Sequence, residues 1–104
     1  IIDALSKEHF DKIHIPSSHN LHYKKAKNMD SKKINSIIKD MIKSNKALEA
    51  YVKKNKLKIT ETPIVVYCYN ADCDASVQLA NTLFKHGYTN IVDYHEGIKG
   101  WLNR

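Results

Sequence analysis

Runs of consecutive apolar residues alternate along the chain with stretches in which apolar residues recur every three or four positions. The clearest run is Ile-Val-Val-Tyr at residues 64–67. Its continuous apolar and β-branched character predicts a strand that is buried on both faces, as in a parallel sheet. Shorter runs at residues 1–5 and 91–94 predict further strands. Residues 14–16 predict the end of another strand, followed by a turn over residues 17–20.

Helical spacing is most regular between residues 31 and 56. The apolar residues that recur there are Ile34, Ile37, Ile38, Met41, Ile42, Leu48, Tyr51 and Val52. Lysines occupy the other face, which predicts an amphipathic segment packed against the core. The pattern allows one long helix or two shorter helices separated near Ser44 and Asn45.

Three shorter helical segments are also predicted. Ser6 is a suitable N-cap for a brief helix over residues 7–11. A helix over residues 76–87 has an apolar stripe that we expect to face the core, formed by Val77, Ala80, Leu83 and Phe84. Gly87 is a suitable cap for its C-terminal end. In the last helical piece, Trp101 is expected to pack on the core.

Strands that alternate with helices predict an α/β sandwich with a mostly parallel sheet. The 104 residues, with 42% hydrophobic and 27% charged residues, suit one domain over residues 1–104. No apolar run approaches the roughly 18 residues that a membrane span requires, so we expect no membrane association. We expect a cytoplasmic protein, or a periplasmic one if a signal preceding Ile1 has been removed.

The net charge of +6 raises the question of nucleic-acid binding. All but one of the 17 Lys and Arg residues are lysines, and the exception is Arg104. Base readout and phosphate clamping favour the planar guanidinium of arginine, and no nucleic-acid-binding motif is present. We therefore expect no nucleic-acid partner. The positive field should instead attract small anions or acidic partners.

Cys68 lies where the apolar strand stops and a helix is about to begin. The free N–H groups and the dipole of a helix N-terminus favour the thiolate form of a cysteine. The alternative is an inert thiol that closes a buried strand, because free cysteine is among the most buried residue types. Ligands of parallel sheets bind beyond the carboxyl ends of the strands, and this favours the reactive interpretation.

The second cysteine, Cys73, is separated from Cys68 by four residues. The pair can form a local disulfide or work as an attacking and a resolving thiol, and the sequence does not decide between these alternatives. A zinc site needs two further ligands. The histidines, including His14, His19 and His22, have no spacing that links them to the cysteines, so we expect no metal.

Several short motifs in this order and spacing resemble a rhodanese-like domain, and they cover most of the chain. They are Ile2-Asp3, His14-Ile15-Pro16 with Asn20, Val65-Val66-Tyr67-Cys68, the helix over residues 76–87 with Tyr88 and Asn90, and Tyr94 through Gly97-Ile98 to Trp101. The resemblance implies a three-layer sandwich with a five-stranded parallel sheet between helices. It also implies that the strand and helix that usually open the domain, before Ile1, are missing here.

The resemblance further implies that Cys68 is the nucleophile of a sulfurtransferase. In this family the cysteine accepts sulfane sulfur as a persulfide from thiosulfate or a persulfide donor, and passes it to a thiol or cyanide, without a cofactor. The active-site loop would comprise Tyr69, Asn70, Ala71, Asp72, Asp74, Ala75 and Ser76. Its main-chain N–H groups would stabilise the anionic sulfur. Ser76 would cap the following helix or donate its hydroxyl to the loop.

The loop departs from the common family pattern. It is longer than usual and carries Asp72 and Asp74 but no cation, so it should repel dianionic thiosulfate. It resembles a subgroup in which Cys68 is followed by four residues, Cys73, two residues and Ser76. Leu5, Ile13 and Glu96 also differ from the residues usual at their positions. These features favour a protein or small molecule that carries a persulfide as the donor, and a thiol as the acceptor.

Other functions remain open from the sequence. Cys73 is a candidate resolving thiol, and the cysteine pair also suits a thiol redox protein. A non-catalytic rhodanese-like interaction module is a further alternative. The phosphatases and arsenate reductases of similar fold need an arginine after the cysteine, and none follows Cys68 before Lys85. For His14 we expect a structural role in the turn, and for His95 a position near the active face.

Overall fold

The computed structural model describes residues 1–70 and 72–103. Its strands are β1 (Ile2–Asp3), β2 (His19–Asn20), β3 (Ile64–Tyr67) and β4 (Ile91–Tyr94). Its helices are α1 (Lys7–Lys12), α2 (Tyr23–Lys27), α3 (Ser31–Ser44), α4 (Lys46–Lys54), α5 (Ala75–Lys85) and α6 (Gly97–Leu102), with a 3-10 turn η1 (Ile59–Glu61). The predicted α/β class is confirmed. None of these helices is long and apolar enough to cross a membrane.

The described strands form one parallel sheet in the order β2-β1-β3-β4. Asp3 lies opposite Asn20 of β2 and opposite Tyr67 of β3. Tyr67 in turn lies opposite Tyr94 of β4. The parallel sheet is therefore confirmed, with four strands among the described residues, and the fifth strand stays a prediction.

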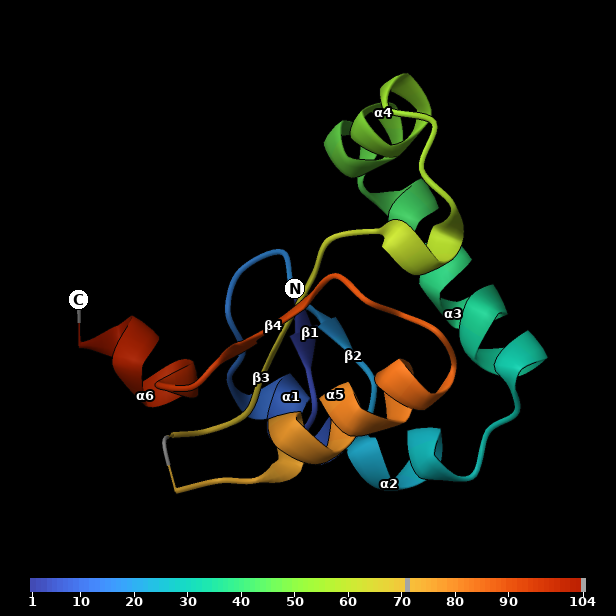
Figure 1. The fold of residues 1–104 in the computed structure, drawn as a ribbon. Coiled ribbons are helices and arrows are strands. Elements are labelled where there is room, and N and C mark those ends of the chain that lie inside the picture. Colours follow the sequence, from blue (N-terminus) through green and yellow to red (C-terminus); the bar gives the residue numbers. More distant parts are fainter. Residues whose placement is uncertain (71, 104) are drawn as a thin grey trace.

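Side chains of β3 alternate between two apolar clusters on opposite faces of the sheet. Ile64, Val66 and the following Cys68 belong to the larger cluster, to which α2, α3 and α5 contribute. Tyr67 belongs to the smaller cluster, together with Ile98 of α6. Figure 1 shows α6 on one side of the strands and α3 on the other. Burial on both faces explains why this segment is continuously apolar.

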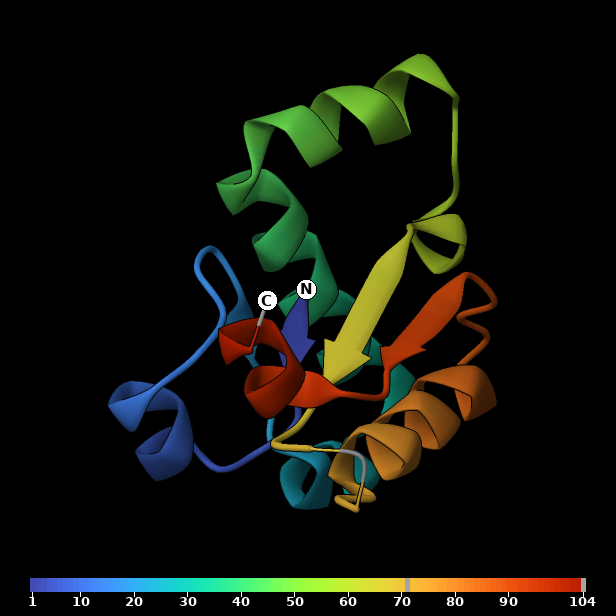
Figure 2. The same ribbon diagram turned by 90° about the vertical axis from the view of Figure 1, so that its left-hand side faces the viewer.

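The amphipathic segment between residues 31 and 56 forms two helices, α3 and α4. This confirms the second of the two predicted alternatives. The carboxylate of Asp30 caps α3 by accepting a hydrogen bond from Lys33 N (2.8 Å). Asn45 breaks the segment and caps α4, its Oδ1 accepting from Leu48 N (3.1 Å). No residue of α4 is fully buried, and the helix projects away from the sheet (Figures 1 and 2).

Two elements near the N-terminus differ from the prediction. Residues 14–16 do not form a strand, and β2 lies instead at His19–Asn20, inside the predicted turn. Its position depends on Asn20, whose Nδ2 donates hydrogen bonds to the carbonyl oxygens of Asp3 (3.2 Å) and Leu5 (2.7 Å). Helix α2 was not predicted, because Ala26 is its only buried residue and leaves no apolar stripe in the sequence.

The predicted buried face of α5 is confirmed for Leu83, which is fully buried, and for Ala80, which packs partly buried against the core, but it is wrong for Val77 and Phe84. Val77 and Phe84 are 42% and 55% exposed. The residues that face the sheet are Ala75, Ser76, Leu79 and Leu83. This face begins with Ser76, and because serine is polar, the spacing of apolar residues does not reveal the face. The C-terminal cap is confirmed, since Gly87 has a φ of 93° and its N–H donates to Phe84 O (2.9 Å).

The last helix also packs differently from the prediction. Trp101 was expected on the core, but its side chain is 37% exposed. Ile98 takes this place instead, with 1% of its surface exposed. Ile98 packs there against Ile15 and Tyr67.

Candidate active site

Cys68 lies at the carboxyl end of β3, immediately after Tyr67. The chain then forms a loop that ends where α5 begins at Ala75. Because Cys68 continues the face of Ile64 and Val66, its side chain joins the larger apolar cluster and is only 2% exposed. The position follows from the alternation of a strand, which sends every second residue to the same face.

Cys68 and Cys73 form a disulfide, with a Cα–Cα distance of 6.3 Å. Of the alternatives that the sequence left open, the structure therefore shows the disulfide, and neither cysteine is a free thiol in this state. Cys73 is partly buried and packs against the larger cluster. Cys73 is thus the more accessible member of the pair.

Ser76 is the side chain that hydrogen-bonds the sulfur of Cys68. It lies in the first turn of α5, is 3% exposed, and its hydroxyl donates to Cys68 Sγ over 3.9 Å. The predicted capping role is wrong, because the N-cap residue is Asp74 and no side chain caps the helix. The predicted donation of the hydroxyl to the loop also differs from the structure, because the acceptor is the sulfur of Cys68. This buried hydroxyl has the sulfur of Cys68 as its hydrogen-bond partner.

Two of the loop amides have partners other than the sulfur of Cys68. Asp72 N donates to Asn70 Oδ1 and Cys73 N donates to Asn70 O, each over 3.1 Å. Within the described part of the chain, no main-chain N–H donates to Cys68 Sγ. The predicted amide cradle is therefore not found in the described disulfide-bonded structure, where Cys68 lies in the larger apolar cluster.

The remaining predicted loop residues differ in exposure. Tyr69, Asp72 and Asp74 are exposed, Asn70 is half-buried and Ala75 is buried, while Ala71 lies outside the described residues. The carboxylate of Asp74 accepts a hydrogen bond from Gln78 Nε2 (3.0 Å). The exposed rim of the loop therefore carries negative charge, as the sequence indicates.

Helix α6 fixes the first two residues of the loop. Ile98 N donates to Cys68 O (3.0 Å), and Lys99 N donates to Tyr69 O (2.9 Å). This close approach requires glycine at position 97, where φ is 61° and a Cβ would lie 2.7 Å from the carbonyl carbon of Tyr69. Glu96 has an ordinary helical φ of −73°, so its departure from the family's usual glycine has no conformational cost.

Tyr67 anchors the chain on the opposite face of the sheet, a role that the sequence analysis missed. Its hydroxyl accepts a hydrogen bond from Ile15 N (3.1 Å) and shares one with Ser18 Oγ (2.8 Å). Burial raises the pKa of Tyr67 above its ordinary value. The sequence does contain a signal for this role. A tyrosine at the end of a buried apolar strand usually finds a hydrogen-bond partner for its hydroxyl group.

Asp3 is fully buried beside Tyr67. Its Oδ1 accepts a hydrogen bond from Leu5 N (2.8 Å), and its Oδ2 has no hydrogen-bond partner among the described residues. Burial raises the pKa of this carboxyl group. Asp3 therefore fixes the turn after β1 at the cost of holding a carboxylate away from water.

The histidines are not gathered around the cysteines. His14 is exposed, its Nδ1 is 2.8 Å from Phe10 O, and its ring stacks on that of Phe10, with the ring centroids 3.9 Å apart. These contacts are those of the structural role expected for it. Across residues 1–70 and 72–103, no cluster of His, Cys, Asp and Glu is arranged to hold a metal ion.

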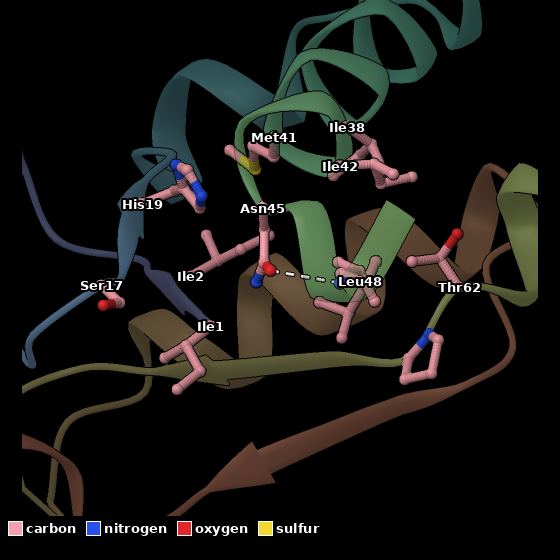
Figure 3. Close-up of a pocket in the computed structure, with 12 residues that line it drawn as sticks. Ile1, Ile2, Ser17, His19, Ile38, Met41, Ile42, Asn45, Leu48 and Thr62 are labelled. Carbon is pink, nitrogen blue, oxygen red and sulfur yellow. Dashed lines mark hydrogen bonds between the residues drawn. The ribbon is translucent and has the colours of Figure 1, made fainter. Parts of the chain in front are cut away.

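A pocket with both apolar and polar lining residues lies at the other end of the sheet (Figure 3). Its wall includes Ile1 and Ile2 at the start of β1 and Pro63 before β3. Met41 and Leu48 face it from α3 and α4 (Figure 3). These residues surround the amino ends of the strands, whereas Cys68 follows a carboxyl end. The pocket is therefore separate from the cysteine loop.

Comparisons with known proteins agree with this arrangement. The sequence matches the Rhodanese-like domain family over residues 1–104. A solved structure with a similar fold is the human single-domain sulfurtransferase TSTD1, with 16% sequence identity and a TM-score of 0.64. The match covers 99% of this chain and 80% of the human one. No curated protein matches the sequence. The chain belongs to the rhodanese-like domain family.

Proposed function

We propose that this protein is a sulfurtransferase that carries sulfane sulfur as a persulfide on Cys68. The observation that supports the proposal most strongly is the position of Cys68, at the carboxyl end of a central strand in a rhodanese-like chain. The hydroxyl of Ser76 on its sulfur adds a hydrogen-bond donor to a thiolate there. The human protein of similar fold is itself named a sulfurtransferase.

The reaction requires the loop to be reduced first, because a disulfide-bonded Cys68 has no thiolate. The Cys68 thiolate then attacks the outer sulfur of the donor. A bond forms between Cys68 Sγ and that sulfur, the sulfur–sulfur bond of the donor breaks, and the rest of the donor leaves with the electron pair. The leaving group is sulfite if the donor is thiosulfate, and a thiolate if it is a persulfide. A thiol or cyanide acceptor then takes the outer sulfur.

The charge of the loop favours a persulfide donor. Asp72 and Asp74 are exposed on its rim, and residues 69–76 contain no Lys or Arg. Two carboxylates repel the two charges that thiosulfate brings to the loop more strongly than the single charge of a persulfide group. We therefore expect faster sulfur transfer from a small persulfide, or from a protein that carries one, than from thiosulfate.

The test is sulfur uptake by the reduced protein. Glutathione persulfide and thiosulfate are supplied separately, with cyanide as the acceptor, and thiocyanate is measured. We expect turnover with the persulfide to exceed turnover with thiosulfate. Cys68→Ser should abolish it, while the matched variant Cys73→Ser should retain it. Equal turnover by Cys68→Ser would remove this residue from the mechanism.

The disulfide also favours a second candidate, a thiol redox protein that uses Cys68 and Cys73. Such a protein would exchange electrons with a dithiol and take up no sulfur. Reduced protein that is alkylated rapidly but never gains a sulfur atom would favour it. A non-catalytic interaction module would show neither sulfur uptake nor rapid alkylation of Cys68.

A further inference from the structure

We propose that Cys73 discharges the persulfide on Cys68 as hydrogen sulfide, and that the Cys68–Cys73 disulfide is the product of this step. The inference rests on the proposed function, because it requires a persulfide on Cys68. It adds an activity to that function. With Cys73 present, the protein releases sulfide even when no sulfur acceptor is bound.

The structure brings the two sulfur atoms into bonding contact without a partner protein. Cys68 is held at the end of β3 by the hydrogen bond from Ile98 N. The hydrogen bond from Cys73 N to Asn70 O (3.1 Å) holds Cys73 near the start of the loop, and the disulfide joins it to Cys68. Cys73 then packs against the same apolar cluster as Cys68. An attacking group held in place in this way reacts far faster than one that must diffuse to its target.

The step balances without an external oxidant. The Cys73 thiol loses its proton to solvent, and its thiolate attacks the inner sulfur of the persulfide, which is Cys68 Sγ. The bond between the two cysteine sulfurs forms, and the bond from Cys68 Sγ to the outer sulfur breaks. The outer sulfur leaves with the electron pair as hydrosulfide. The sulfane sulfur is reduced, and the two cysteines are oxidised to the disulfide.

The exposure of the two cysteines determines how the disulfide is reopened. Cys68 is 2% exposed, whereas Cys73 is only partly buried. An external thiol therefore reaches Cys73, forms a mixed disulfide there, and displaces Cys68 as a thiolate. The hydroxyl of Ser76 is placed to donate a hydrogen bond to this thiolate. A second thiol then frees Cys73, so each cycle consumes two thiols and yields one disulfide of the external thiol.

The experiment is a single turnover of reduced protein with one equivalent of glutathione persulfide. Intact mass and released sulfide are followed in the wild type, in Cys73→Ser and in Cys68→Ser. Cys68→Ser serves as the background for spontaneous release from the donor. We expect the wild type to release one equivalent of sulfide and to lose two hydrogens. Cys73→Ser should instead gain one lasting sulfur atom, with sulfide release slower by at least about 100-fold.

The outcomes separate this inference from the proposed function. A wild type that keeps its added sulfur as Cys73→Ser does, or that forms the disulfide without releasing sulfide, overturns the inference and leaves the sulfurtransferase intact. Failure of both the wild type and Cys73→Ser to take up sulfur overturns both.

A second measurement tests the order of attack on the disulfide. Oxidised wild-type protein is exposed briefly to glutathione, quenched with iodoacetamide and mapped by peptide mass. We expect glutathione on Cys73 and the alkyl group on Cys68. The reverse distribution would overturn the reopening route.

Discussion

The two ends of β3 are held by different forces. At the amino end, Ile64 lies among apolar side chains such as Ile38, beside the pocket of Figure 3. At the carboxyl end, Cys68 belongs to the same apolar cluster, but Cys68 and the loop after it are held in addition by hydrogen bonds from α6, by the hydroxyl of Ser76 and by the disulfide. The comparison indicates that the apolar end carries stability, whereas the hydrogen-bonded end positions the reacting sulfur.

The largest effect on stability is expected at the apolar end. Ile38 is 2% exposed, so Ile38→Ala should lower the free energy of unfolding by about 2–5 kcal/mol, through lost burial and the cavity left behind. Sulfur uptake per folded molecule should not change. Urea unfolding and uptake measured on the same sample check both expectations.

The matched control is Ile13→Ala, because Ile13 is 42% exposed. It should change the free energy of unfolding by less than about 1 kcal/mol. Equal losses from the two variants would show that the apolar end does not carry the stability assigned to it.

The next effect is expected where α6 meets the loop. Gly97→Ala places a Cβ against the backbone of Tyr69 at a positive φ, and should cost at least about 1–3 kcal/mol of stability. It should also reduce sulfur uptake, because the backbone that holds Cys68 must shift. Sulfur uptake by Gly97→Ala, measured at a temperature at which the variant is folded, tests this expectation.

Gly87→Ala is the control for this variant. Gly87 also has a positive φ, but an added Cβ would meet only Thr60 Cγ2, at an ordinary 3.7 Å. Gly87→Ala should therefore lower stability without changing uptake. A parallel loss of uptake in both variants would rule out a specific contact between α6 and the loop.

Much of the fold is predictable from the sequence, and the reasons are visible at particular residues. Strands β3 and β4 match the predicted bounds because both are rich in β-branched and aromatic residues, although β4 also contains Asp93. Asn45 separates α3 from α4 as a cap that the sequence displays. In contrast, β2 has two residues, and its position depends on hydrogen bonds from Asn20 to residues distant in the chain.

The candidate site was predictable in position but not in detail. Cys68 could be placed because it ends a strand, a local property of the chain. The buried face of α5 begins with Ser76, and a polar residue at a buried position gives no apolar signal. The contact of the Tyr67 hydroxyl with Ser18 joins residues 49 positions apart, so no local pattern indicates it. The disulfide was one of several alternatives that spacing alone allowed.

A smaller effect concerns the buried carboxyl group beside Tyr67. Burial raises the pKa of Asp3 in the folded state, so the folded protein holds this proton more tightly than the unfolded chain. The contribution to stability is therefore fully present below the pKa of the unfolded chain, and it is lost as the pH rises through the higher folded pKa. Asp3→Asn removes this dependence and keeps the oxygen that accepts from Leu5 N.

We expect the stability of Asp3→Asn relative to the wild type to be higher at pH 7 than at acidic pH. This relative stability should fall as the pH is lowered toward 4. Unfolding by urea at several pH values measures the difference. A relative stability that rises toward acidic pH would contradict the assignment.

The smallest effect is expected from Ser76→Ala. In a Cys73→Ser background, loss of the hydroxyl at 3.9 Å should slow the reaction of Cys68 with iodoacetamide at pH 7 by a few-fold, since a hydrogen bond to sulfur at this distance is weak. The control is the same pair of proteins in urea, where the rates should be equal. An unchanged rate in the folded protein would show that Ser76 plays no part in activating the sulfur.

The most direct test of the central claim is the location of the sulfur that the protein accepts. Reduced Cys73→Ser is treated with glutathione persulfide, digested without further reduction, and mapped by peptide mass. The account predicts one added sulfur atom on the peptide that contains Cys68. A protein that remains folded and reduced but carries no sulfur on Cys68 would contradict it.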